Sequence, residues 1–139
     1  MERTEQEKEQ MTALLRALDN VYSSSEKIRT ELFALEMKKS DVDKKMARRE
    51  SAIYKNIIDA VDEEGKPKYS NENKRKIAKD EALRNDPEYL QIAEDLKDTE
   101  YQKKQREIDF DNLKYRARFL HTCIDKEVFV EPHFWGGGQ

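Results

Sequence analysis

Apolar residues recur along the first half of the chain at alternating spacings of four and three. Fifteen positions from Met11 to Ala60 follow this spacing, and eleven of them are apolar. Such a repeat is typical of the buried stripe of a coiled coil, where charged residues occupy the other helix faces. It predicts one helix over residues 3–62. The run from Ser23 to Glu26 has a capping-box pattern that would mark a break, but the repeat keeps its register there, which favours continuity.

A second repeat with the same spacing runs from Tyr89 to Ile124. It follows Asp86 and Pro87, which form a typical helix start, because Asp caps free amides and Pro fits the first helical position. The pattern predicts a helix over residues 87–126. The stripe residues that we expect to pack in the two long helices are Leu18, Ile28, Leu32, Leu35, Leu96, Phe110, Leu113 and Leu120.

Residues between the two repeats carry turn signals. Gly65 and Pro67 lie close together, and Asn71 precedes a polar helical stretch. These signals predict a turn over residues 63–70 and a short helix over residues 71–85. The expected fold is all-α, a single long antiparallel helical hairpin of the coiled-coil type over residues 1–126. Folding the chain about residue 66 places Leu96 near Leu35 and Phe110 near Val21.

The hairpin has more apolar residues than one stripe can bury. The flanking residues are Leu15, Phe33, Ile57, Ile58, Leu90 and Phe119. This apolar surface is wider than a contact between two helices and favours a second hairpin packing alongside. We therefore expect the chain to bind itself and to form a homo-oligomeric helical bundle.

Composition limits the class of protein. Charged residues make up 41% of the chain and hydrophobic residues 36%, with 27 basic and 30 acidic residues, so the apolar residues must lie on narrow stripes. Cys123 is the only cysteine, which excludes an internal disulfide and favours a reducing compartment. We see no signal-peptide pattern and no apolar stretch of about 18 residues that could span a membrane. A soluble cytoplasmic protein without membrane contacts is expected.

The C-terminal residues 127–139 differ from the rest of the chain. They are rich in apolar and aromatic residues, and Pro132 prevents a helix. One interpretation is a tail that folds back over exposed apolar surface. The other is a docking segment for a partner protein, whose contact residues would be Val128, Phe129, Phe134 and Trp135.

The sequence predicts no catalytic residue, no metal site and no cofactor. His121 and Cys123 are two residues apart on a predicted helix, which puts them about 200° apart around its axis, so they cannot share a metal. His133 has no second ligand nearby, and no glycine-rich phosphate loop is present. We expect a protein that is not an enzyme.

Basic residues form clusters that could contact the phosphates of a nucleic acid. They are Lys38, Lys39, Lys44, Lys45, Arg48 and Arg49, followed by Lys74, Arg75 and Lys76. In so charged a chain, such runs are more commonly solvated helix faces whose bases pair with acids one turn away. The net charge of -3 also argues against nonspecific binding of nucleic acid by the whole molecule.

The stretches from Glu63 to Arg75 and from Arg84 to Tyr89, followed by a heptad helix, resemble small coiled-coil proteins of bacteriophages and prophages. The resemblance covers residues 62–120 and implies a place in the cytoplasm of a bacterial host, as an accessory of DNA metabolism or an inhibitor of host defence. The sequence thus favours a non-enzymatic protein-binding or assembly module. The alternative is a nucleic-acid-binding accessory protein of DNA recombination or replication.

Overall fold

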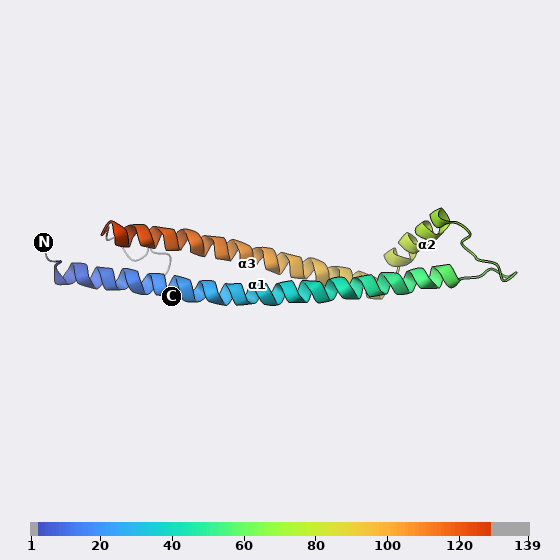
Figure 1. Ribbon diagram of the computed structural model, residues 1–139, viewed down its shortest axis with the longest axis horizontal. Coiled ribbons are helices and arrows are strands. Elements are labelled where there is room, and N and C mark those ends of the chain that lie inside the picture. Colours follow the sequence, from blue (N-terminus) through green and yellow to red (C-terminus); the bar gives the residue numbers. More distant parts are fainter. Residues whose placement is uncertain (1–2, 129–139) are drawn as a thin grey trace. The chain divides into compact units, whose positions relative to one another are not determined.

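The computed structural model describes residues 3–128, and this part of the chain is helical, as expected (Figure 1). Helix α1 comprises Glu5–Asp59, α2 comprises Glu72–Arg84, and α3 comprises Pro87–Asp125. Residues 3–128 contain no strand, only an isolated antiparallel bridge between Val61 and Pro67. Within the same residues, no helix combines the length and the apolar character that crossing a membrane requires.

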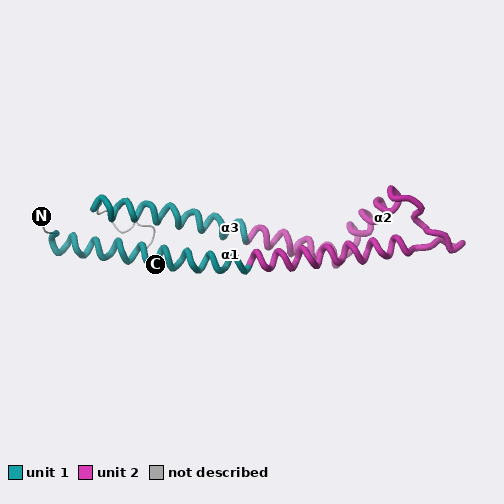
Figure 2. The backbone as a smooth tube through the Cα atoms, in the orientation of Figure 1, with its two compact units in different colours: residues 1–34, 103–139 teal, residues 35–102 magenta. Residues whose placement is uncertain are grey.

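The chain forms two compact units (Figure 2). The terminal unit comprises residues 1–34 and 103–139, and the turn unit comprises residues 35–102. Each unit contains a segment of α1 and a segment of α3, and the turn unit also contains α2. The two segments within each unit run antiparallel, as their contacts below show.

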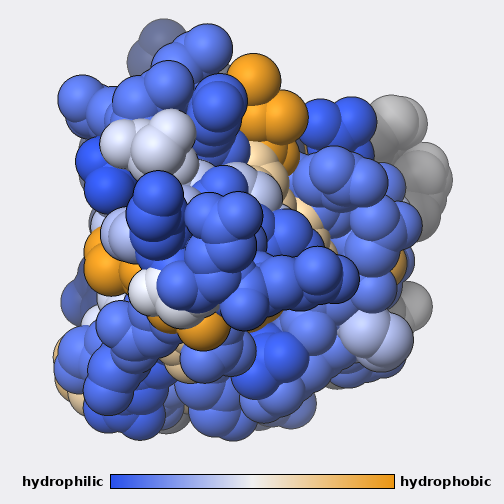
Figure 3. All heavy atoms as spheres, turned by 90° about the vertical axis from the view of Figure 1, so that its right-hand side faces the viewer, coloured by the Kyte–Doolittle hydropathy of each residue, from blue (hydrophilic) through white to orange (hydrophobic). Residues whose placement is uncertain are grey.

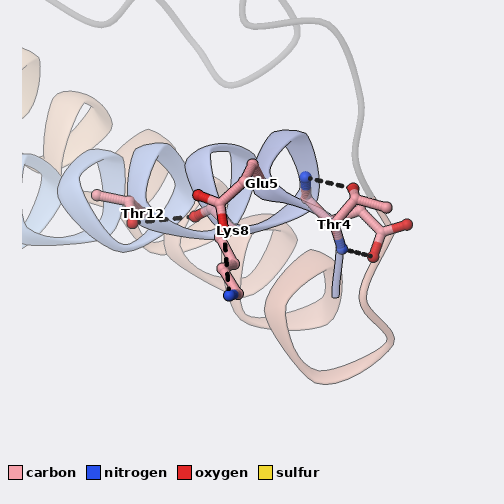
Figure 4. Close-up of polar contacts among 5 residues, drawn as sticks. Thr4, Glu5, Lys8 and Thr12 are labelled. Atoms are coloured by element: carbon pink, nitrogen blue, oxygen red, sulfur yellow. Dashed lines mark hydrogen bonds and ion pairs between the residues drawn. The ribbon is translucent and has the colours of Figure 1, made fainter. Parts of the chain in front are cut away.

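A capping box begins α1. The Glu7 amide donates to the Thr4 hydroxyl at 3.2 Å, and the Thr4 amide donates to the Glu7 carboxylate at 3.4 Å (Figure 4). These two bonds satisfy amides that lack partners within the helix. The similar pattern at Ser23 to Glu26 caps nothing, since α1 runs through it without interruption. The continuous helix that the repeat favours is what the structure contains.

The turn after α1 is built around Asp62. Its carboxylate accepts hydrogen bonds from the amides of Glu64 at 2.9 Å and Lys66 at 3.0 Å, while its own amide donates to the Lys66 carbonyl at 2.8 Å. Gly65 has a φ of 78°, which a residue with a side chain adopts only with strain. These local bonds compete with helical ones, so α1 ends at residue 59 and not at the predicted residue 62.

Side-chain caps begin the two later helices where the sequence predicts them. Asn71 caps α2 by accepting the Lys74 amide at 2.8 Å. Asp86 caps α3 by accepting the Tyr89 amide at 2.8 Å, and Pro87 is the first residue of that helix. At its other end, α3 closes with a Schellman motif, in which Glu127 has a φ of 52° and the Val128 amide donates to the Cys123 carbonyl at 2.9 Å.

The core of the terminal unit combines three residues of each long helix. They are Leu14, Leu18 and Val21 from α1 with Leu113, Leu120 and Cys123 from α3. Two of them, Leu14 and Leu120, are fully buried. The core is narrow, one stripe from each helix, which is what the low apolar content allows.

The turn unit has a smaller apolar interior. Val42, Ile53 and Ile57 of α1 are buried. Thr99 of α3 is fully buried as well, and its hydroxyl donates to the Asp95 carbonyl at 2.7 Å, so no hydrogen-bonding group of this side chain is lost. Figure 3 views this end of the molecule, where most of the visible surface is hydrophilic and apolar side chains show between charged ones.

The pairing of α1 with α3 differs from folding the chain about residue 66. In the terminal unit, the Arg29 guanidinium lies 5.7 Å from the centre of the Phe110 ring, although the prediction put Phe110 near Val21. In the turn unit, Lys39 pairs with Glu100, although Leu35 was expected near Leu96. Both contacts are displaced by eight residues from that register, which is about two helical turns. A simple fold-back about residue 66 counts every residue as one helical rise along the axis. Turn residues advance by a different distance, and α2 occupies part of the connection, so the observed register differs.

Candidate functional site

The most organised polar contact in the turn unit is centred on Arg49. Its guanidinium donates to both oxygens of Asp86, with Nε to Oδ2 at 2.8 Å and Nη2 to Oδ1 at 2.7 Å. It also lies 3.2 Å from the Glu88 carboxylate. Hydrogen bonds from Arg49 are the main reason that the pKa of Asp86 is lowered from 3.8 to about 2. The same bonds raise the pKa of Arg49.

A second contact lies beside this pair. The Tyr89 hydroxyl donates to the Glu50 carboxylate at 3.2 Å. Burial, followed by this neighbouring carboxylate, raises the pKa of Tyr89. Residues 49 and 50 of α1 thus hold residues 86 and 89 at the start of α3. The contacts position the start of α3 against α1 within the turn unit.

The structure changes the interpretation of the first basic cluster. Arg49 makes the ion pairs described above, and Lys39 lies 3.9 Å from Glu100. Both residues occupy positions of the heptad stripe and face α3. Their place in the stripe was a signal against counting them among the possible phosphate contacts. The cations that remain exposed are Lys38, Lys44, Lys45 and Arg48. Within residues 3–128, none of these four makes an ion pair.

The second basic cluster does not form a single surface. Lys74, Arg75 and Lys76 are consecutive in α2, so their side chains point in directions about 100° apart. Lys74 and Lys76 are exposed, whereas Arg75 is half-buried and its Nε lacks a hydrogen-bond partner. At most one or two of the three can contact the same phosphate strand.

The predicted stripe residues lie in the interior of their units or at its edge. Leu18, Leu113 and Leu120 are buried. The other predicted stripe residues are half-buried, namely Ile28, Leu32, Leu35, Leu96 and Phe110. The middle of the α3 stripe is polar, and there Arg106 pairs with Glu31 at 3.3 Å, while the cations of Arg29 and Lys114 lie over the Phe110 ring. Charge pairing thus replaces apolar packing in this part of the contact.

Large apolar side chains remain exposed in the terminal unit. On α3 they are Ile108, Tyr115 and Phe119, with 46%, 64% and 41% of their surface exposed. Their spacing of seven and four residues places them on one face of the helix, about 140° around the axis from the buried Leu113. In this unit, α3 therefore carries a second apolar stripe that stays exposed, and this stripe lies beside the buried one at Phe119 and Cys123, which are one turn apart.

The turn unit contains a groove of about 670 Å³. Its lining consists of Lys68 and Tyr69 from the turn, with Lys74, Ile77, Ala78, Glu81, Ala82 and Asn85 from α2 and its C-terminal cap. A smaller depression of about 430 Å³ lies on α1 and combines acids with bases: it is lined by Glu36, Lys39, Ser40, Asp43, Lys44 and Ala47. The groove has more apolar residues in its lining, since Ile77, Ala78 and Ala82 line it whereas Ala47 lines the depression.

His121 and Cys123 of α3 each contact or pack against other parts of the terminal unit. The His121 Nε2 is hydrogen-bonded to the Tyr22 hydroxyl at 2.5 Å. Cys123 is buried, and burial raises the pKa of its thiol, which disfavours the reactive thiolate. Over the described range 3–128, no three His, Cys, Asp or Glu residues are grouped so that they could hold a metal ion.

The predicted docking tail is described at its first contact residue alone. Val128 is 46% exposed and ends the Schellman motif of α3, where Arg3 pairs with Glu127. Phe129, Phe134 and Trp135 lie outside the described residues.

Comparison with known proteins assigns no family to the chain. No protein-family model, no curated protein and no solved structure matches it.

Proposed function

We propose that this protein is a non-enzymatic assembly and protein-binding module. In this proposal α1 and α3 pair as an antiparallel coiled-coil hairpin, and a further helix docks on the outer face of α3. The observation that carries the proposal is the stripe of Ile108, Tyr115 and Phe119, large apolar side chains that stay exposed on α3 beside its buried core residues. A helix that is apolar on two faces is typical of bundles with more than two helices.

A second copy of the chain is the proposed occupant of this face. Homo-oligomers with two-fold symmetry are the commonest soluble assemblies, and they use the same patch on both copies. Burying a side chain such as Ile or Phe contributes about 1.5–3 kcal/mol, so two copies of this stripe supply a useful part of an association free energy. Aromatic side chains add contact area at a small cost in conformational entropy.

Charge substitution on the stripe tests the proposal. The double variant Ile108→Glu with Tyr115→Glu puts two carboxylates on the outer face of α3 and leaves the buried core residues in place. Its mass by light scattering is expected to fall to that of one chain, with helix content by circular dichroism unchanged. Asn20→Glu is the matched control, because it adds a carboxylate at an exposed position of α1 in the same unit. An unchanged mass in the double variant would contradict the proposal.

The resemblance to bacteriophage coiled-coil proteins extends this proposal. The assembled module would then serve as an accessory of a phage or as an inhibitor of host defence in a bacterial cytoplasm. The exposed Val128 at the end of α3, leading into residues 129–139, is the proposed docking point for such a partner.

A nucleic-acid-binding accessory is the second candidate, and the observation that favours it is the set of exposed cations on α1. Lys38, Lys44, Lys45 and Arg48 make no ion pair within residues 3–128, although the acids Asp41 and Asp43 lie among them. Four phosphate contacts predict a slope of about -3 or steeper in a plot of log affinity against log salt. Lys45→Glu with Arg48→Glu should flatten this slope, whereas Lys97→Glu in α3 should not.

The affinity itself decides between the two candidates. Binding to single-stranded and double-stranded oligonucleotides no tighter than about 10⁻⁴ M at ~50 mM salt would exclude a role in nucleic-acid binding.

A further inference from the structure

The groove on α2 has the composition of a helix-packing surface. Ile77 is 58% exposed, and the two alanines beside it, Ala78 and Ala82, are one helical turn apart. Small residues at this spacing let the backbone of another helix approach closely, and the exposed Ile provides a side chain to pack against it. Within residues 3–128, this exposed part of the Ile77 side chain has no other part of the chain over it.

Two opposite charges flank this apolar centre. Lys74 and Glu81 both line the groove, seven residues apart and thus on one face of α2. Their separation along the axis is about 10.5 Å, which is too far for an ion pair within the helix. In the part of the chain that the structure describes, neither makes an ion pair with any other residue.

We propose that the groove binds α2 of a second copy of this chain, with the two helices antiparallel about a two-fold axis. In this arrangement Lys74 of each copy faces Glu81 of the other, and Ile77 of each copy packs against Ala78 of the other. The surface is self-complementary, since one rotation forms both ion pairs and both apolar contacts.

Charge complementarity favours this occupant over two others. A parallel pair of α2 helices would place Lys74 against Lys74 and Glu81 against Glu81, which is repulsive. An acidic peptide would be attracted by Lys68 and Lys74 but would meet Glu81 in the same groove. The antiparallel second copy is the arrangement in which every charge among these lining residues of α2 meets one of opposite sign.

This inference rests on the proposed assembly function, because the α2 contact is small. Helix α2 has 13 residues and is about 20 Å long. One face of so short a helix buries much less than the area of about 800 Å² that each partner buries in a stable interface. The α2 contact therefore adds to an assembly formed elsewhere and fixes the orientation of the copies. It lies in the turn unit, so it can be tested separately from the α3 stripe of the terminal unit.

Site-specific crosslinking tests the arrangement in the full chain. In a Cys123→Ala background, Ala78→Cys places a thiol close to the proposed two-fold axis, and Lys76→Cys places one on a different face of α2. A short bis-maleimide is expected to join two copies of Ala78→Cys at least about five times faster than two copies of Lys76→Cys. Equal rates at the two positions would overturn the proposal.

A charge swap gives a second readout that loss of folding cannot imitate. In the Ala78→Cys chain, Lys74→Glu or Glu81→Lys alone should slow crosslinking several-fold, because each removes both ion pairs of the symmetric contact. Combining the two substitutions should restore the rate, and failure to restore it would overturn the proposal.

The α3 variants keep the two ideas distinguishable. If Ala78→Cys does not crosslink while Ile108→Glu with Tyr115→Glu still dissociates the protein, the α2 inference is wrong and the assembly function stands. If neither the crosslink nor an assembly of any kind is found, both are wrong.

Discussion

Arg49 in α1 donates two hydrogen bonds to Asp86, the residue that caps the start of α3. A single carboxylate thereby ends the connection after α2, begins α3 and holds α3 against α1. Bidentate pairs of this kind combine charge with fixed geometry, since the planar guanidinium matches the two carboxylate oxygens. The contact explains why a basic residue occupies position 49 of a mostly apolar stripe.

Removing the guanidinium should weaken the turn unit. Arg49→Met keeps the apolar stem but leaves Asp86 without its cation, so we expect a lower midpoint of thermal unfolding at pH 7. The neighbouring Arg48→Met is the control, because Arg48 is exposed and makes no ion pair within residues 3–128. Equal midpoints for the two variants would show that the Arg49 contact contributes nothing.

The contribution of Asp86 should depend on pH. Its pKa is lowered from 3.8 to about 2, so the charged form is favoured by folding, and the stabilisation is complete above about pH 4 and is lost as the pH falls towards 2. Asp86→Asn keeps a capping side chain but has no charge. The midpoint difference between wild type and Asp86→Asn, measured by circular dichroism, should shrink between about pH 4 and pH 2. A constant difference would contradict the assigned pKa.

The core of the terminal unit can be tested with adjacent leucines. Leu14 is fully buried, whereas 49% of Leu15 is exposed. We expect Leu14→Ala to lower the free energy of unfolding by about 2–5 kcal/mol, through lost apolar burial and the cavity left behind. Leu15→Ala should cost less than about 1 kcal/mol in the single chain. Urea unfolding of dilute protein measures both, and similar costs would mean that the helix faces are assigned wrongly.

The turn after α1 makes a prediction about backbone strain. Gly65 has a φ of 78°, and nothing lies within 4 Å of where a Cβ would be, so substitution there is strained by the backbone alone. Gly65→Ala should cost about 1–2 kcal/mol in unfolding free energy. Gly65→Asn should cost less, because Asn adopts this conformation more readily. If Gly65→Ala and Gly65→Asn lower the unfolding free energy equally in urea, the cost comes from contacts of the new side chain and not from the backbone conformation.

The helices of this protein were predictable because their signals are local. The repeat that predicts a long first helix, the Asp86 cap and the Asn71 cap each depend on residues a few positions apart, and the long helix and both caps are found in the structure. The Thr4 capping box carries a sequence signal of the same kind, Thr followed by Glu three residues later, and sequence reasoning did not use it.

The pairing of the helices was less predictable, because it depends on the path of the connection. The pairing of Lys39 with Glu100 and the stacking of Arg29 on Phe110 follow from where the Asp62 turn ends α1 and how α2 is placed. No local pattern encodes that path. The same uncertainty left Arg49 among the possible phosphate contacts, since its partner Asp86 could not be placed opposite it.

The candidate interaction surfaces required knowledge of what the fold leaves uncovered. The spacing of Lys74, Ile77, Ala78 and Glu81 is visible in the sequence, but a helical face becomes a candidate only when neighbouring elements do not bury it. Ile108 and Tyr115 are likewise apolar residues whose importance comes from their exposure.

Sedimentation equilibrium of the full chain over a range of concentrations tests the central claim, self-assembly, most directly. One chain has a mass of 16.5 kDa. At tens of micromolar protein we predict a mass of at least two chains, which falls towards that of one chain on dilution, since mass action governs such an assembly. A mass of 16.5 kDa at every concentration would contradict the account.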